Sequence, residues 1–210
     1  MKESEKLIAR QLLQINAIKL NPAKPFTWAS GWKSPIYCDN RKTLSYPEVR
    51  TAIRDSFTGL IRNKYPQTQG IAGVATGAIA HGALVAGAMD LPFIYIRSSA
   101  KGHGLENLIE GHYEPGQQFV IIEDLISTGG SSLNAVNALR DAGCKVLGML
   151  AVFTYGFPAS VENFLQAGCP LDTLSNYEVL IELASESGYI SESDVDTLKE
   201  WRKAPDQWRQ

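Results

Sequence analysis

Apolar residues recur along the chain in two alternating patterns, short continuous runs and longer stretches at helical spacing. The runs at 70–75, 93–97, 119–122 and 145–154 predict strands, of a kind that is buried on both faces of a parallel sheet. Helical spacing and capping residues predict helices at 3–19, 47–65, 79–89, 133–142, 159–167, 177–187 and 191–203. Because strands alternate with helices, we predict an α/β fold with a mainly parallel sheet flanked by helices.

The segment 21–41 breaks this alternation, since it is rich in turn-forming and aromatic residues. The simplest interpretation is a pair of short strands joined by a turn at Ser30-Gly31. The alternative is that its aromatic residues and Lys33 contact a flat anionic base. The residues alone favour the structural interpretation by about two to one.

Composition narrows the class of protein. The chain has 210 residues and a formal net charge of −2, so no general affinity for nucleic acid is expected. Its three cysteines show no metal-ligand spacing, which favours reduced thiols. No signal-peptide core follows the charged N-terminus and no window resembles a membrane span. We therefore expect a cytoplasmic protein that binds neither nucleic acid nor membrane.

The stretch 119–132 carries the clearest chemistry. A buried strand runs into Glu123-Asp124, and a segment rich in Ser, Thr and Gly (127–132) leads to the next helix. Loop amides that end at a helix N-terminus favour an anion such as phosphate, and Gly129-Gly130 lets a ligand approach the backbone. Carboxylates beside a phosphate site make sense if the ligand also has vicinal hydroxyls. The combination predicts a sugar-phosphate site, although each residue taken singly is more often structural.

Two further loops follow predicted strands. Thr76-Gly77-Ala78 is either a second anion site or a tight turn. The segment 98–111 is either a solvated hairpin or a mobile lid, with Arg97, Lys101 and His103 as its cations. Ligands of open α/β sheets bind beyond the carboxyl ends of the strands, so we expect all three loops to converge on one ligand.

The 119–132 segment resembles the signature of the type I phosphoribosyltransferases, which bind phosphoribosyl pyrophosphate (PRPP). The resemblance implies that Glu123 and Asp124 hold the ribose hydroxyls and that the following loop holds the 5-phosphate. Thr76, Gly77 and Ala78 would contact pyrophosphate. The full PRPP-binding set that it implies is Arg97, Lys101, His103, Glu123, Asp124, Leu125, Ile126, Ser127, Thr128, Gly129, Gly130 and Ser131. Lys101, His103 and Asp124 would be the catalytic residues.

The N-terminal segment adds a second resemblance. Phe26-Thr27, Ser30-Gly31 and Lys33-Ser34-Pro35 are similar to the hood of the orotate-specific branch of this family. This likeness implies that Tyr37, Cys38 and Ser127 contact orotate. It also implies one phosphoribosyltransferase domain over 1–210, with hood elements at about 1–45 and a C-terminal helical segment at about 159–210.

The implied reaction transfers the ribose 5-phosphate group of PRPP to orotate, giving orotidine 5′-phosphate and pyrophosphate for pyrimidine synthesis. The resemblance also implies Mg²⁺, held mainly through PRPP and water rather than by protein ligands. It further implies a homodimer in which the lid of one subunit reaches the partner's site. Cationic contacts of some members are missing at Ala29, Ala78, Ser98 and around Tyr155.

Two other functions compete with this one. A phosphoribosyltransferase for a purine or uracil would share the sugar-phosphate site, but the hood argues against it. A PRPP-sensing regulator would keep the site without catalysis. The lid cations and the absence of a basic extension argue against that class.

Overall fold

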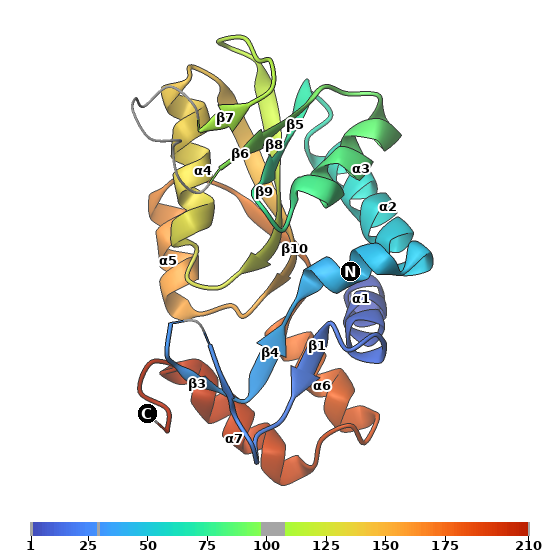
Figure 1. Ribbon diagram of the computed structural model, residues 1–210, viewed down its shortest axis with the longest axis vertical. Helices are drawn as coiled ribbons and strands as arrows, with labels where there is room; N and C mark the ends of the chain where they lie inside the picture. The colour runs from blue at the N-terminus through green and yellow to red at the C-terminus, as the bar shows by residue number, and fades with distance from the viewer. Residues whose placement is uncertain (1, 29, 98–107, 210) are drawn as a thin grey trace.

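The computed structural model describes residues 2–28, 30–97 and 108–209. Its centre is a six-stranded sheet in the order β10-β9-β8-β5-β6-β7 (Figure 1). The strands are β5 (Gly70–Val74), β6 (Phe93–Ile96), β7 (Ile109–Glu110), β8 (Gln118–Ile126), β9 (Lys145–Thr154) and β10 (Leu171–Asn176). Every neighbouring pair is parallel except β6 and β7, which confirms the predicted mainly parallel sheet.

Helices cover both faces of the sheet. They are α1 (Lys2–Gln14), α2 (Pro47–Lys64), α3 (Ile79–Met89), α4 (Gly130–Asp141), α5 (Pro158–Gln166), α6 (Tyr177–Glu186) and α7 (Glu192–Lys203). Val120 and Ile122 of β8 pack in the cluster that includes α1, α2 and α3, whereas Phe119 and Ile121 pack with α4 and α5. β8 is therefore buried on both faces, as its continuous apolar run predicts.

The sequence prediction is wrong near the N-terminus and at β10, which it did not include. A helix was expected over 3–19, but α1 ends at Gln14 and Asn16 adopts a left-handed φ of 55°. β1 (Ile18–Leu20) follows and pairs antiparallel with β4 (Ile36–Cys38), which had not been predicted. Isoleucine at 15 and 18 fits both a helix face and the start of a strand, so spacing alone could not locate the boundary.

The hood consists of two small antiparallel pairs. β2 (Phe26–Thr27) pairs with β3 (Lys33–Ser34), which confirms the predicted pair of short strands, and β1 pairs with β4. A 3₁₀ helix, η1 (Asn40–Ser45), then links β4 to α2. Figure 1 shows the hood beside α6 and α7, at the end of the sheet where β8 and β9 finish.

Aromatic packing joins the hood to the C-terminal helices. Trp201 is completely buried, and its ring lies edge-on to those of Trp28 and Phe157, with centroids 5.6 Å and 5.4 Å away. Trp208 is also buried. Both tryptophans therefore pack the C-terminal tail onto the body of the protein.

β8 and α4 differ from the prediction where the chemistry lies. β8 extends to Ile126, so Glu123 and Asp124 are part of the strand. α4 begins at Gly130 rather than at residue 133, so Ser131 and Ser132 belong to its first turn. Among the described residues, no helix has the length and apolar character needed to cross a membrane.

Candidate active site

A cleft of about 240 Å³ opens at the carboxyl ends of β5, β6 and β8. It brings together residues of the loops that follow β5 and β8 and Arg97 at the end of β6. Among the predicted site residues, Thr76, Gly77, Arg97, Glu123, Asp124, Leu125 and Ser131 line it. The loops after β5 and β8 therefore converge at the cleft, as expected, whereas residues 98–107 of the third loop lie outside the described residues.

Glu123 lies on the floor of the cleft and is 5 % exposed. Its Oε1 accepts a hydrogen bond from the Asp124 amide (2.9 Å), and its Oε2 accepts one from the Ser132 hydroxyl (2.8 Å). Burial, and secondly the neighbouring Asp124 carboxylate, raise the pKa of Glu123 well above its usual range. Ser132 had no predicted role beyond its hydroxyl, and the structure makes it the group that orients Glu123.

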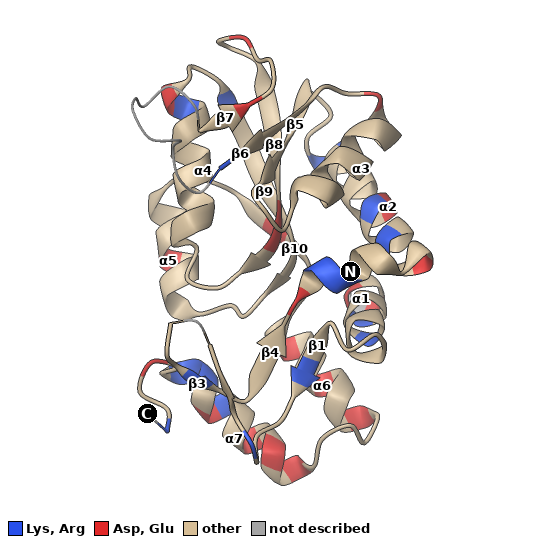
Figure 2. Cartoon of the chain, in the orientation of Figure 1, with Lys and Arg blue, Asp and Glu red and all other residues tan. Residues whose placement is uncertain are grey.

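Asp124 is more accessible than Glu123, and it contacts two other segments, the loop after β5 and η1. Gly77 approaches so closely that a Cβ at this position would fall on the Asp124 carboxylate. From the other side, Nδ2 of Asn40 donates a 2.6 Å hydrogen bond to the Asp124 carbonyl. Figure 2 shows the acidic end of β8 in the middle of the molecule, next to the basic η1 segment. The loop after β5 and the hood therefore meet at one residue.

The 127–129 loop leads directly into the N-terminus of α4. Gly129 has a φ of 86°, a left-handed conformation that favours glycine, and it is the N-cap residue of this helix. The first amides of a helix have no partner within the helix, and they carry its positive end. The predicted phosphate loop thus has the geometry of an anion site, although Ser127, Thr128, Gly129 and Gly130 do not line the cleft itself.

The residues of the loop after β5 differ in whether they reach the cleft. Thr76 and Gly77 line the cleft, and the Ala75–Thr76 peptide bond is cis. Ala78 is buried, and its amide donates to the carbonyl of Val74 (3.0 Å). Thr76 and Gly77 are therefore the members of this loop that can meet a ligand in the cleft.

Ile126 differs from the other predicted ligand-binding residues. Its side chain is fully buried, and its carbonyl accepts hydrogen bonds from the Tyr155 amide (3.1 Å) and the Thr154 hydroxyl (3.3 Å). It fixes the end of β8 against β9.

Arg97 reaches the cleft from the end of β6. Its Nη1 lies 3.4 Å from Oε1 of Glu110 on β7, across the base of the hairpin. This ion pair is partly exposed, so it leaves the guanidinium accessible to an anion. Lys101 and His103, with Gly102, Gly104 and Ser98, lie outside the described residues.

The predicted base-contacting residues lie on β4. Tyr37 is 40 % exposed, and its ring centroid is 5.7 Å from that of Phe26. Cys38 is partly buried and donates to Oδ1 of Asn40 (3.3 Å). Burial, followed by the Asp124 carboxylate, raises the pKa of the Cys38 thiol.

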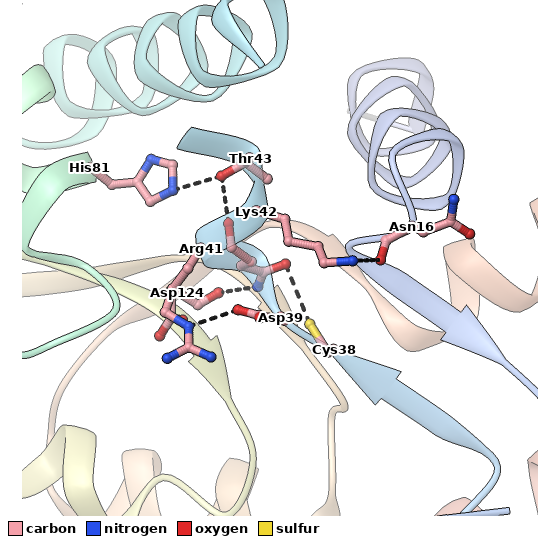
Figure 3. Close-up of polar contacts among 9 residues, drawn as sticks. Asn16, Cys38, Asp39, Arg41, Lys42, Thr43, His81 and Asp124 are labelled. Carbon is pink, nitrogen blue, oxygen red and sulfur yellow. Dashed lines mark hydrogen bonds and ion pairs between the residues drawn. The ribbon is translucent and has the colours of Figure 1, made fainter. Parts of the chain in front are cut away.

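Sequence analysis missed the polar network around η1 (Figure 3). The Thr43 hydroxyl donates to the Asn40 carbonyl (2.5 Å) and lies 3.0 Å from Nε2 of His81 on α3. Asn40, Thr43 and His81 are all buried, and burial lowers the pKa of His81. The triplet Asp39-Asn40-Arg41 after a short strand was the available signal, but in sequence it is indistinguishable from an ordinary turn.

A larger hollow of about 920 Å³ lies between α6 and α7. It lies beyond the ends of β9 and β10, where Gly156 and Tyr177 line it. Its polar lining includes Glu178 and Arg202, which pair with each other at 2.7 Å. The smaller cleft is the better candidate site because it collects the acidic pair and the anion-binding loops.

The cleft offers limited means of holding a metal through the protein alone. Within the described parts of the chain, no group of three or more His, Cys, Asp or Glu side chains is arranged to hold a metal ion. Glu123 and Asp124 do supply hard oxygen donors. This set fits Mg²⁺, which commonly keeps several waters and binds through one or two carboxylates and substrate phosphates.

Comparison with known proteins agrees with the geometry. Residues 44–167 match the phosphoribosyl transferase domain. An orotate phosphoribosyltransferase of Bacteroides thetaiotaomicron is 60 % identical over 208 residues, which cover 99 % of this chain and 98 % of that protein.

Two solved structures have the same fold. UMP synthase of Leishmania donovani matches with a TM-score of 0.80 at 26 % identity, over 96 % of this chain and 42 % of that longer protein. Orotate phosphoribosyltransferase of Aeropyrum pernix matches with a TM-score of 0.76 at 24 % identity, over 88 % of this chain and 99 % of that one.

The raised pKa of Glu123 predicts how stability depends on pH. The folded chain binds this proton more tightly than the unfolded chain, so stability falls as pH rises from about 4.3 towards the folded-state pKa. Glu123→Gln removes the buried charge. We expect the variant to have a higher free energy of unfolding than the parent at about pH 8, with a smaller difference at about pH 5.

Urea unfolding at the two pH values measures the effect. Glu200→Gln, at an exposed position on α7, is the matched control and should show no such pH-dependent gain. A Glu123→Gln variant that is no more stable than the parent at the higher pH would contradict the claim that ionised Glu123 is buried at a cost in stability.

Proposed function

The chain belongs to the phosphoribosyltransferase family, as an orotate phosphoribosyltransferase, and on this premise we propose that the cleft at the ends of β5, β6 and β8 binds PRPP. The observation that carries the proposal is the meeting of Glu123 and Asp124 with the Thr76-Gly77 loop and the first turn of α4. These elements suit the ribose, the pyrophosphate and the 5-phosphate respectively. The reaction transfers the ribose 5-phosphate group to orotate and releases pyrophosphate.

The acidic pair acts on the sugar. The bond between ribose C1′ and the pyrophosphate oxygen breaks, the orotate ring nitrogen bonds to C1′, and the proton of that nitrogen leaves to water or to the departing pyrophosphate. Positive charge develops on the ribose in the transition state. Asp124, and the more deeply buried Glu123, accept hydrogen bonds from the ribose hydroxyls and stabilise that charge electrostatically. Ser132 holds Glu123 in place for this role.

The remaining loops act on the phosphates. Amides of the first turn of α4 receive the 5-phosphate, as expected for an anion at a helix N-terminus. Thr76 and Gly77 contact the departing pyrophosphate through their backbone, and Arg97 offsets its growing negative charge. Orotate then lies on the hood side, near Tyr37 and Cys38, with Ser127 at its edge.

Mg²⁺ belongs to the proposal as a partner of PRPP. When bound, it neutralises charge on the pyrophosphate and so favours its departure. Asp124 and Glu123 would hold it indirectly, through ribose oxygens and water.

We also propose that the protein acts in the cytoplasm, in pyrimidine synthesis. The free thiols of Cys38, Cys144 and Cys169 support a reducing compartment.

An assay of pyrophosphate release tests the proposed function. The protein is incubated with Mg²⁺, PRPP and, in turn, orotate, uracil, adenine or hypoxanthine. Release is expected with orotate, and chelation of Mg²⁺ should abolish release and also weaken PRPP binding measured by calorimetry. Turnover with another base but not orotate would overturn the substrate assignment, and PRPP binding without any turnover would favour a regulator.

We further propose that the active protein is a homodimer in which Lys101 and His103 act in the partner's site. Lys101→Ala and Asp124→Ala proteins should each be nearly inactive alone, because one lacks a lid cation and the other a ribose contact. When the two are mixed, hybrid dimers contain one intact site and should regain activity. Subunit exchange verified by mass spectrometry without any recovery would contradict a shared site.

A further inference from the structure

An enzyme that selects orotate must recognise a carboxylate on a pyrimidine ring, because this group distinguishes orotate from uracil. The acidic pair makes the task harder, since Glu123 and Asp124 repel an anion placed beside them. A cation on the hood side of Asp124 is therefore needed. Thr154-Tyr155-Gly156, after β9, contains none.

Most described cations near the hood have other partners or lie elsewhere. Lys33 donates to the Thr27 hydroxyl (2.9 Å) within the β2–β3 pair, and Lys42 donates to the Asn16 carbonyl (3.2 Å). Arg97 lies at the end of β6, on the pyrophosphate side, and pairs with Glu110. Lys19 lies opposite Tyr37 on β1, whereas Arg41 lies beside Asp124 (Figure 3), which makes Arg41 the stronger candidate.

Arg41 follows the predicted base-contacting residues by three positions, on η1. Its side chain is 62 % exposed, and its Nε donates to Oδ1 of Asp39 (2.7 Å). Within the described residues, its two terminal nitrogens have no hydrogen-bonding partner. One edge of the guanidinium is thus held by Asp39, while the other is free to receive a carboxylate through two parallel hydrogen bonds.

The position of Arg41 relative to the acidic pair is fixed by its neighbour. Asn40 is 1 % exposed and is bonded to the Asp124 carbonyl, while Thr43 closes the same turn of η1 onto the Asn40 carbonyl. Figure 3 shows Arg41 beside Asp124, whereas Lys42 turns away towards Asn16. Arg41 stays positively charged, because the hydrogen bond that it donates to Asp39 and, less strongly, the charges of Asp124 and Tyr37 raise its pKa.

We infer that Arg41 binds the carboxylate of orotate and is a residue that selects orotate over uncharged pyrimidines. This inference rests on the proposed function. Arg41, on η1, then supplies the cation that is absent from the loop after β9. Arg41 also offsets the repulsion between Asp124 and the incoming anion, so the base and the ribose can lie side by side.

Steady-state kinetics of Arg41→Gln test the inference, with Lys42→Gln as the matched control at the next position. Arg41→Gln should raise KM for orotate at least about tenfold, because a charge-assisted contact is lost, and should change KM for PRPP by less than about threefold. Arg41→Lys should be intermediate, since it keeps the charge but loses the two-bond geometry. Lys42→Gln should leave both KM values within about twofold.

Uracil supplies the second readout. The ratio of kcat/KM for orotate to that for uracil should fall at least about tenfold in Arg41→Gln, because uracil has no carboxylate to lose. An unchanged KM for orotate, or a rise in KM for PRPP instead, would overturn the role of Arg41. A parent enzyme that does not turn over orotate at all would refute the proposed function itself, and this inference with it.

Discussion

Asp124 is the residue on which the geometry of the cleft depends, because it is held from three sides. Its amide donates to the Glu123 carboxylate, its carbonyl accepts from Asn40, and its own carboxylate fills the space that a side chain at position 77 would need. These contacts join the central strand β8 to the hood and to the loop after β5. The end of β8 therefore positions the parts of the cleft proposed to hold the base, the ribose and the pyrophosphate.

The electrostatics of the cleft follow from this crowding. Two adjacent carboxylates lie where an anionic ligand has to bind, and one of them is buried at a cost that raises its pKa. The positive end of α4 and the guanidinium of Arg97 offset this charge around the phosphates, and Arg41 offsets it on the hood side. Such an arrangement favours a ligand with hydroxyls at its centre and negative charge at its ends, which is the charge pattern of PRPP.

Much of the fold was predictable because each core strand is a continuous apolar run. β9 and α3 begin and end where the sequence predicts. The acidic pair was recognised, but its strand was drawn too short because carboxylates usually mark the end of a buried run. β8 continues past them because Leu125 and Ile126 pair with Phe153 and Thr154 of β9.

The remaining features could not be predicted because they depend on contacts between distant positions. β10 was missed because Leu171–Asn176 has only two apolar residues, Leu171 and Leu174, and they are not adjacent. Its pairing with β9 makes it a strand. Asn40 and Asp124 are 84 positions apart, and no local pattern identifies either as the other's partner. The sequence thus identified loops that meet at the cleft but left open how the hood is attached.

The most direct test of a single site built around Asp124 is the affinity of Gly77→Ala for PRPP, measured by calorimetry with Mg²⁺ present. Gly87→Ala, in α3 with open space around it, is the matched control and should bind PRPP normally. Gly77→Ala is expected to lose most of its affinity for PRPP, because the new methyl group displaces either the Asp124 carboxylate or the loop that faces it. Undiminished affinity in a folded Gly77→Ala protein would contradict the convergence of these elements on one ligand.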